Sequence, residues 1–139
     1  ERIDGRGTWA PPADRRYRRT MTERVAKLGA VVINVSDFET EKTFWAAMLG
    51  TGIRSEFPGF CWFEPQHDGG VMLALQASPD PGATSGRVHI DTQVDDVDEA
   101  RGAVEGLGGT FVEEHEAAGF RWAIMADPEG NRFCIASGH

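Results

Sequence analysis

The sequence predicts an α+β fold that contains the same βαβββ unit twice, and three observations support this prediction. Residues 35–50 align with residues 94–109 without a gap, so that Asp37 falls on Asp96. Each aligned stretch passes from a strand into an aspartate, an amphipathic helix and a closing glycine. Apolar, β-prone runs then follow each helix. One duplicated unit accounts for all three observations.

The size of the chain predicts one domain. Its 139 residues, of which 40% are hydrophobic, can build one core but are too few for two full-sized domains. Residues 1–20 mix glycine, proline and arginine with no helical or strand period, so we expect an irregular basic arm there. The domain is expected over residues 21–139, with a first unit at about 28–77, a linker at 78–86 and a second unit at about 87–137.

The first unit begins with an alternating, β-branched strand at residues 30–35. Asp37 follows it and can accept hydrogen bonds from the free N–H groups at the start of a helix. Gly50 ends this helix, whose apolar side carries Phe38, Trp45, Met48 and Leu49. Later runs predict strands at residues 52–56, 59–64 and 71–76.

Prolines and glycines in the linker interrupt the hydrogen bonding between strands of the first unit before the second unit begins. A strand at residues 87–94 then leads into Asp96 and Glu99, which have the spacing of a capping box. The helix after them presents Val97, Ala100, Val104 and Leu107 on one side. The remaining predicted strands are residues 110–115, 120–125 and 132–136.

The strand at residues 87–94 has one polar and one apolar face. Alternation places Arg87, His89, Asp91 and Gln93 on one side and Val88, Ile90, Thr92 and Val94 on the other. We expect the apolar face to pack on a helix and the polar face to meet solvent or a wet cavity. Two curved units place such a cavity between them, which is the usual location of a small-molecule site.

Three segments carry a family resemblance: residues 35–45, residues 89–100 and the DPEGN turn with its following strand at 127–134. They resemble the strand-to-helix starts and terminal hairpin of the glyoxalase/bleomycin-resistance protein/dioxygenase group, the vicinal oxygen chelate superfamily. The resemblance covers about residues 28–137. It implies two βαβββ modules in a glyoxalase-like fold with a concave cavity. The DPEGN turn also has a purely structural reading, because proline, glycine and asparagine favour chain reversal.

The resemblance also implies a divalent metal held by the first and last strand of each unit. His89 matches a ligand position in the second unit, but Ala30 occupies its counterpart in the first. Cys134 stands where a glutamate is expected, and the first-unit counterpart is Ala74 or Leu75. A catalytic centre needs about three protein ligands, so we expect no metal. A divalent metal on His89, Asp91, Gln76 and Cys134 is the alternative.

The leading hypothesis is a metal-independent small-molecule-binding protein that resembles the antibiotic-sequestering members. The candidate ligand-binding residues are Asn34, Gln76, His89, Asp91, Trp122 and Cys134. The rival hypothesis is a metal-dependent lyase, isomerase or dioxygenase that uses His89, which could also act as a general base. A structural or regulatory interaction module is a third possibility, so the sequence leaves open whether the protein is an enzyme.

Charge and motifs exclude other classes. A net charge of −8 repels nucleic acid and anionic lipid, so neither is an expected partner, whereas an acidic body favours a cationic ligand. No apolar run is long enough for a membrane span, and no hydrolase, NTPase or dinucleotide motif occurs. Because no such apolar run and no secretion signal occur, we expect a cytoplasmic location. Cys61 and Cys134 do not form a CxxC pair, so we expect buried free thiols. The resemblance and the sheet edges predict a homodimer.

Overall fold

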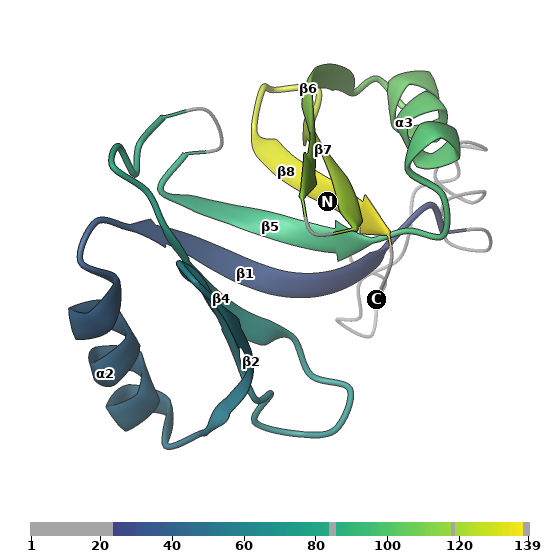
Figure 1. Ribbon diagram of the computed structural model, residues 1–139. Coiled ribbons are helices and arrows are strands. Elements are labelled where there is room, and N and C mark those ends of the chain that lie inside the picture. The colour runs from purple at the N-terminus through teal and green to yellow at the C-terminus, as the bar shows by residue number, and fades with distance from the viewer. Residues whose placement is uncertain (1–23, 84–85, 118, 138–139) are drawn as a thin grey trace, which may run out of the picture.

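The computed structural model describes residues 24–83, 86–117 and 119–137, and it contains the predicted unit twice (Figure 1). Module one consists of β1 (Lys27–Val35), α2 (Phe38–Leu49), β2 (Ile53–Phe57), β3 (Phe60–Phe63) and β4 (Met72–Ala77). Module two consists of β5 (Val88–Gln93), α3 (Val97–Gly106), β6 (Thr110–Ala117), β7 (Phe120–Ala126) and β8 (Arg132–Ser137). The predicted α+β fold is confirmed. The predicted arm at residues 1–20 lies outside the described residues.

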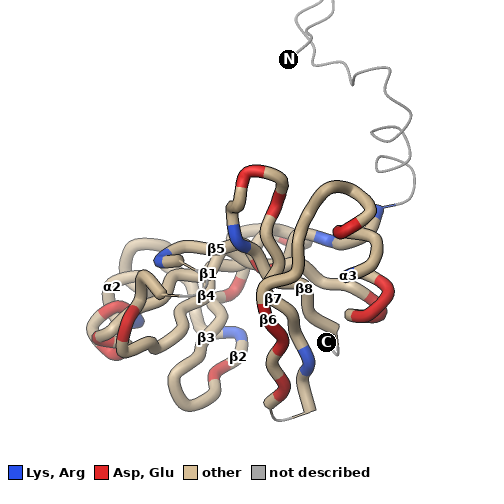
Figure 2. The backbone as a smooth tube through the Cα atoms, turned by 90° about the horizontal axis from the view of Figure 1, so that it is seen from above, with Lys and Arg blue, Asp and Glu red and all other residues tan. Residues whose placement is uncertain are grey.

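The two modules share one curled sheet with the strand order β2-β3-β4-β1-β5-β8-β7-β6. Antiparallel pairing of β1 with β5 joins the modules at the centre, and in each module the first strand pairs in parallel with the last. The registers correspond, because Val32 lies opposite Ala74 and Asp91 lies opposite Cys134. Figure 2 shows β2 and the β6–β7 hairpin on the same side of the curled sheet. A cavity that residues of both modules line lies on this inner face of the sheet.

Each helix starts at the predicted aspartate, and α2 ends at the predicted glycine. The predicted end of the second helix at Gly109 is wrong, because α3 ends at Gly106 with Leu107 as its C-cap, and Leu107 is 45% exposed instead of packed. The Asp37 carboxylate accepts a hydrogen bond from the Thr40 N–H at 3.2 Å, and the Asp96 carboxylate accepts one from the Glu99 N–H at 2.8 Å. Gly50 closes α2 with φ of +63°, a left-handed conformation that glycine adopts without steric cost. These caps fix where each helix leaves its preceding strand.

Each module has its own core under its helix. In module one, α2 packs against β4, around a buried cluster that includes Phe63 and Leu75. In module two, α3 packs against β6, β7 and β8, around a cluster that includes Met125 and Ile135. Figure 1 shows the helices far apart, at opposite ends of the sheet. The outer face of the central strands therefore has no helix over it in the described part of the chain.

The predicted packing of the apolar face of residues 87–94 on a helix holds only at Val94, which belongs to the buried cluster under α3. Val88 and Ile90 are 59% and 44% exposed, because the helices cover β4 and β6–β8 instead of the sheet centre. In module one, Met48 is also 63% exposed, although it was expected on the packed side of α2. Phe38 and Trp45 of the same helix do pack against the module-one core. Among the described residues, no helix is both long and apolar enough to cross a bilayer.

Candidate functional site

A cavity of about 480 Å³ lies on the inner face of the sheet, between the modules. Aromatic side chains from both modules line it: Phe57, Phe60 and Trp62 from module one, and Phe120 and Trp122 from module two. Its volume falls in the range of about 300–1,000 Å³ that is typical of small-molecule sites. The cavity is therefore large enough for a ligand of one or two fused rings.

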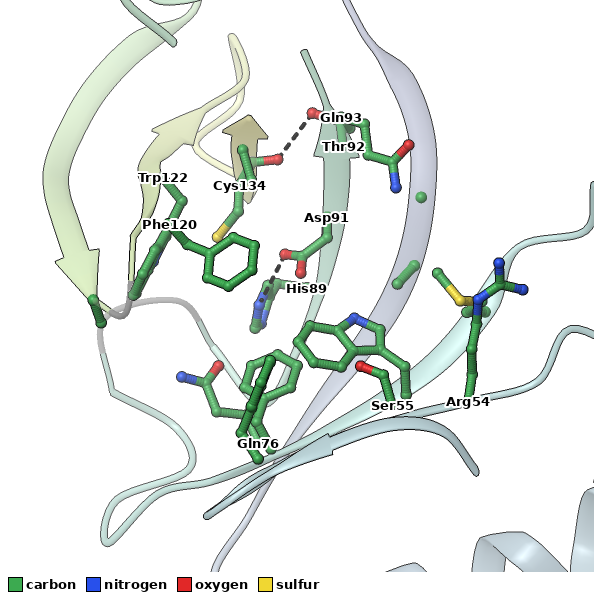
Figure 3. Close-up of a pocket in the computed structure, with 18 residues that line it drawn as sticks. Arg54, Ser55, Gln76, His89, Asp91, Thr92, Gln93, Phe120, Trp122 and Cys134 are labelled. Atoms are coloured by element: carbon green, nitrogen blue, oxygen red, sulfur yellow. Dashed lines mark hydrogen bonds and ion pairs between the residues drawn. The ribbon is translucent and has the colours of Figure 1, made fainter. Parts of the chain in front are cut away.

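Strand alternation brings the polar end of the cavity together. His89 and Asp91 stand two residues apart on β5 and both face the cavity. Parallel pairing of β5 with β8 places Cys134 directly beside Asp91. The Thr92 hydroxyl donates a hydrogen bond to the Cys134 carbonyl oxygen at 2.9 Å, which further ties the two strands together. Figure 3 shows the Asp91 carboxylate near both the His89 ring and the Cys134 thiol.

The polar end contains unsatisfied hydrogen-bonding atoms. His89 is 4% exposed, and its Nε2 lies 3.4 Å from Asp91 Oδ1. Neither His89 Nδ1 nor Asp91 Oδ1 has a hydrogen-bond partner among the described residues, although both atoms are buried. Buried polar atoms without partners cost about 1–3 kcal/mol each. A ligand with matching polar groups would recover this free energy.

The Cys134 thiol is held in its protonated form. Burial raises the pKa of Cys134 far above its ordinary value of 9.0, and the neighbouring Asp91 raises it further through its charge and a hydrogen bond. The nucleophilic and metal-binding form of cysteine is the thiolate, so the thiol is unreactive at neutral pH. Cys134 therefore serves as a weakly polar lining group unless a metal displaces its proton.

Module one offers no matching donors at the equivalent positions. Ala30 and Ala74 are buried alanines on β1 and β4, at the registers of His89 and Cys134. Gln76 also lines the cavity, near the end of β4. Arg54 lines the mouth, where its guanidinium Nη1 lies 3.4 Å from Glu64 Oε2. The positions of module one that correspond to His89 and Cys134 are consequently apolar.

The structure brings together five of the six candidate residues from the sequence, since Gln76, His89, Asp91, Trp122 and Cys134 line the cavity. Asn34 lies outside the lining, and its side-chain amide donates a hydrogen bond to the Gly86 carbonyl oxygen at 2.5 Å. It shares the strand phase of Ala30, but it stands near the end of β1, beyond the hollow.

Sequence reasoning missed two aromatic residues of the walls, Phe57 and Phe120. Phe120 could have been found, because it precedes Trp122 by two residues and so shares its strand face. Phe57 belongs to the short strand β2, whose boundaries had little periodic signal. Trp45 and Phe63 do not line the cavity and belong to the module-one core.

The donor set allows a partial test for a metal. The ligand atoms of His89, Asp91 and Cys134 lie within 4.8 Å of one another. Imidazole, carboxylate and thiolate are all zinc ligands. These residues fit a three-donor site on module two, and Ala30 and Ala74 leave the equivalent positions of module one without a ligand.

The model of the glyoxalase-like domain family matches residues 30–136. The chain belongs to this family. No curated protein matches the sequence of this glyoxalase-like domain. Its βαβββ modules and curled sheet are those of the vicinal oxygen chelate superfamily.

Solved structures share the fold at low sequence identity. Methylmalonyl-CoA epimerase from Mycobacterium tuberculosis is 14% identical, with a TM-score of 0.65 over 84% of this chain and 91% of that one. A glyoxalase/bleomycin resistance protein/dioxygenase superfamily member from Vibrio splendidus 12B01 is 18% identical, with a TM-score of 0.52 over 81% and 99%. The Mn(II)-bound glyoxalase from Novosphingobium aromaticivorans is 27% identical, with a TM-score of 0.56 over 82% of this chain and 39% of that one.

Proposed function

We propose that this glyoxalase-like domain binds a small planar molecule in the cavity between its modules and needs no metal ion to do so. The observation that carries this proposal is an aromatic-walled cavity of about 480 Å³ with unpartnered polar atoms at one end. Such a role corresponds to sequestration of a small molecule, as expected of bleomycin-resistance members. Proposed contact residues are Gln76, His89, Asp91, Trp122 and Cys134.

The aromatic walls support binding of a flat ligand. The Phe60 and Trp62 rings lie 4.2 Å apart between centroids with an interplanar angle of 33°. Phe57 meets Trp62 edge to face at 5.8 Å, and it reaches Phe120 of module two at 6.2 Å. Each aromatic contact with a ligand contributes about 0.5–1.5 kcal/mol beyond the area buried. Contacts from both modules would therefore hold a planar ring system firmly.

A matched pair of substitutions tests the proposal. Phe57→Ala removes a wall residue that is 46% exposed, and Phe44→Ala makes the same change at a residue of α2 that is 52% exposed and outside the cavity. Ligands are first found by calorimetry of chelator-treated protein against planar compounds of one to three rings. Phe57→Ala should weaken binding about tenfold, which corresponds to about 1.4 kcal/mol, and Phe44→Ala should leave it unchanged. Equal effects of both changes, or binding only after metal is added, would contradict the proposal.

The second candidate is a metal-dependent lyase, isomerase or dioxygenase, and the proximity of His89, Asp91 and Cys134 supports it. A zinc-like ion held by these residues would polarise a substrate oxygen. Elemental analysis of the purified protein distinguishes the candidates. Stoichiometric metal that is lost in both His89→Ala and Cys134→Ala would favour the enzyme. Metal-free protein that still binds ligand would reject it.

We also propose that two copies form a homodimer in the cytoplasm. The support for a dimer is that, in the part of the chain that the structure describes, β2 and β6 end the sheet with unpaired edges, which proteins commonly cover. The support for the compartment is that Cys61 and Cys134 are free thiols. Light scattering coupled to gel filtration should give twice the monomer mass of 15.2 kDa. A single-chain mass at all concentrations would exclude the dimer.

A further inference from the structure

We propose that the ligand is an organic cation whose charged group is bound by the Asp91 carboxylate between the aromatic walls. This inference rests on the proposed binding function and narrows its ligand class. Three features of the cavity carry it: the state of Asp91, the distribution of the other charges and the composition of the walls.

The Asp91 carboxylate can accept a hydrogen bond from a ligand. Its side chain is 25% exposed, and Oδ1 is buried without a hydrogen-bond partner. Among the described residues, its ion pair is with His89 alone, and this histidine carries a charge only when it is protonated. The carboxylate therefore has no permanent cation beside it. A bound cation that donates N–H groups would supply the missing positive charge, and it would add hydrogen bonds to the one that this carboxylate shares with the Cys134 thiol.

The positive charge of the cavity lining, on Arg54, is paired with a carboxylate away from Asp91. Arg54 is the other permanently charged residue of the lining, and it pairs with Glu64 at 3.4 Å. Its side chain is 56% exposed, and Figure 3 shows it well apart from Asp91. An anionic ligand would consequently meet the Asp91 charge at the polar end with no free cation to receive it. The net charge of −8 on the chain also attracts cations and repels anions over longer distances.

The walls suit a cation better than an ordinary apolar pocket does. Aromatic ring faces carry partial negative charge, so they attract a cation within about 6 Å of the ring centroid. Phe120 and Trp122 stand on β7 beside the polar end, and Figure 3 shows both rings on the side of Cys134 and Asp91. Aliphatic walls would lack this attraction. The same rings thus bind the planar body and stabilise the charge that Asp91 pairs with.

Three probes of nearly equal shape test the inference. Naphthalene-2-carboxamidine is a cation at neutral pH, naphthalene-2-carboxamide is neutral, and 2-naphthoate is an anion. Their dissociation constants are measured by calorimetry on the full chain. The amidine should bind at least about tenfold more tightly than the amide, and the naphthoate most weakly.

Asp91→Asn should remove the preference for the amidine and keep binding of the amide, which shows that the cavity is intact. Asp80→Asn makes the same change at an exposed residue outside the lining and should keep the wild-type ranking. Equal affinities of the wild type for amidine and amide would overturn the cationic ligand but leave the binding function standing. Binding of none of the probes would reject both proposals. If Asp91→Asn does not fold, the ranking of the three probes by the wild type decides alone.

Discussion

The adjacency of Asp91 and Cys134 governs the chemistry of the cavity at the scale of single residues. Both side chains face the same hollow, where burial and the neighbouring carboxylate keep the thiol protonated. A charged ligand would meet the carboxylate, whereas the thiol contributes shape and weak polarity. This arrangement explains why a buried cysteine at a cavity wall need not be a nucleophile.

The shifted thiol predicts a loss of stability at alkaline pH. The pKa of Cys134 is raised in the folded state, so the folded protein binds this proton more tightly than the unfolded chain. Its contribution is complete below the ordinary pKa of 9.0 and is lost as pH rises above it. The loss should approach about 1.4 kcal/mol per pH unit. Urea unfolding at rising pH should show a shallower decline for Cys134→Ala than for the wild type, and equal slopes would contradict this assignment.

Several cavity residues were predictable from local pattern alone. His89 and Asp91 follow from the two-residue period of a strand, which requires no knowledge of the fold. Asn34 has the same phase as Ala30 but lies outside the cavity, because the extent of the hollow depends on how the whole sheet curls. Phe57 becomes a wall residue only when the sheet brings β2 close to β7. Local periodicity therefore shows which face of a strand a side chain lies on, but it does not show how far that side chain is from the site.

At the scale of elements, caps and turns were the most predictable features, because they depend on side chains a few residues apart. The position of each helix on the sheet was not predictable in this way. The apolar face of β5 looked like a helix-packing surface, yet the helices pack on β4 and on β6–β8. Hydrophobic periodicity shows that a face is apolar without showing what covers it.

The approach of α3 to β6 predicts opposite effects for two glycine substitutions. A Cβ at Gly109 would lie 2.5 Å from Val104 Cγ1 and 2.9 Å from the Ala126 carbonyl oxygen. Gly109→Ala should therefore destabilise the protein by about 1–3 kcal/mol. Gly102 lies within α3, and a Cβ added there would meet nothing within 4 Å, so Gly102→Ala should stabilise the protein by about 0.5–1 kcal/mol. Chemical denaturation measures both, and effects of the same sign would refute the packing at Gly109.

The turn between β7 and β8 predicts an acid-sensitive contribution to stability. Asp127 Oδ1 accepts hydrogen bonds from the Glu129 and Asn131 N–H groups at 3.0 and 2.8 Å. Hydrogen bonds from Asn131 hold the pKa of Asp127 below its ordinary value of 3.8. The stabilisation is thus present above 3.8 and is lost as pH falls below it. Asp127→Ala should lower Tm near neutral pH, with a difference that shrinks in acid. A difference independent of pH would show that the carboxylate charge is not involved.

The whole molecule behaves as one sheet with two cores, and this predicts coupling between the modules. Phe63 is fully buried in module one, and Phe63→Ala should cost about 3–5 kcal/mol. Because β1 pairs with β5, unfolding of module one would remove the backbone hydrogen bonds that β1 makes with β5 of module two. Hydrogen exchange should therefore become faster in β7 and β8 as well as in β4, whereas Phe44→Ala should change neither. Faster exchange confined to module one would mean that the modules open independently.

The duplicated architecture was predictable because both copies kept the same caps, strands and helix periods. The hollow between them was expected from the same duplication, but its aromatic composition depends on residues from distant parts of the chain. Phe57 and Phe120 are far apart in sequence and meet only in the folded sheet. The aromatic walls are therefore determined by the whole fold, and the pattern within one strand does not predict which rings meet.

The alanines of module one have a consequence for stereochemistry. The two modules provide two equivalent sets of positions, so a ligand could in principle bind in either of two opposite orientations. Ala30 and Ala74 provide no polar group in module one, whereas His89 and Cys134 provide polar groups at the equivalent positions of module two. A ligand with one polar end should therefore bind with that end beside His89 and Cys134. The two enantiomers of a chiral ligand would then place different substituents against the alanines of module one. The protein should therefore bind the two enantiomers with different affinities.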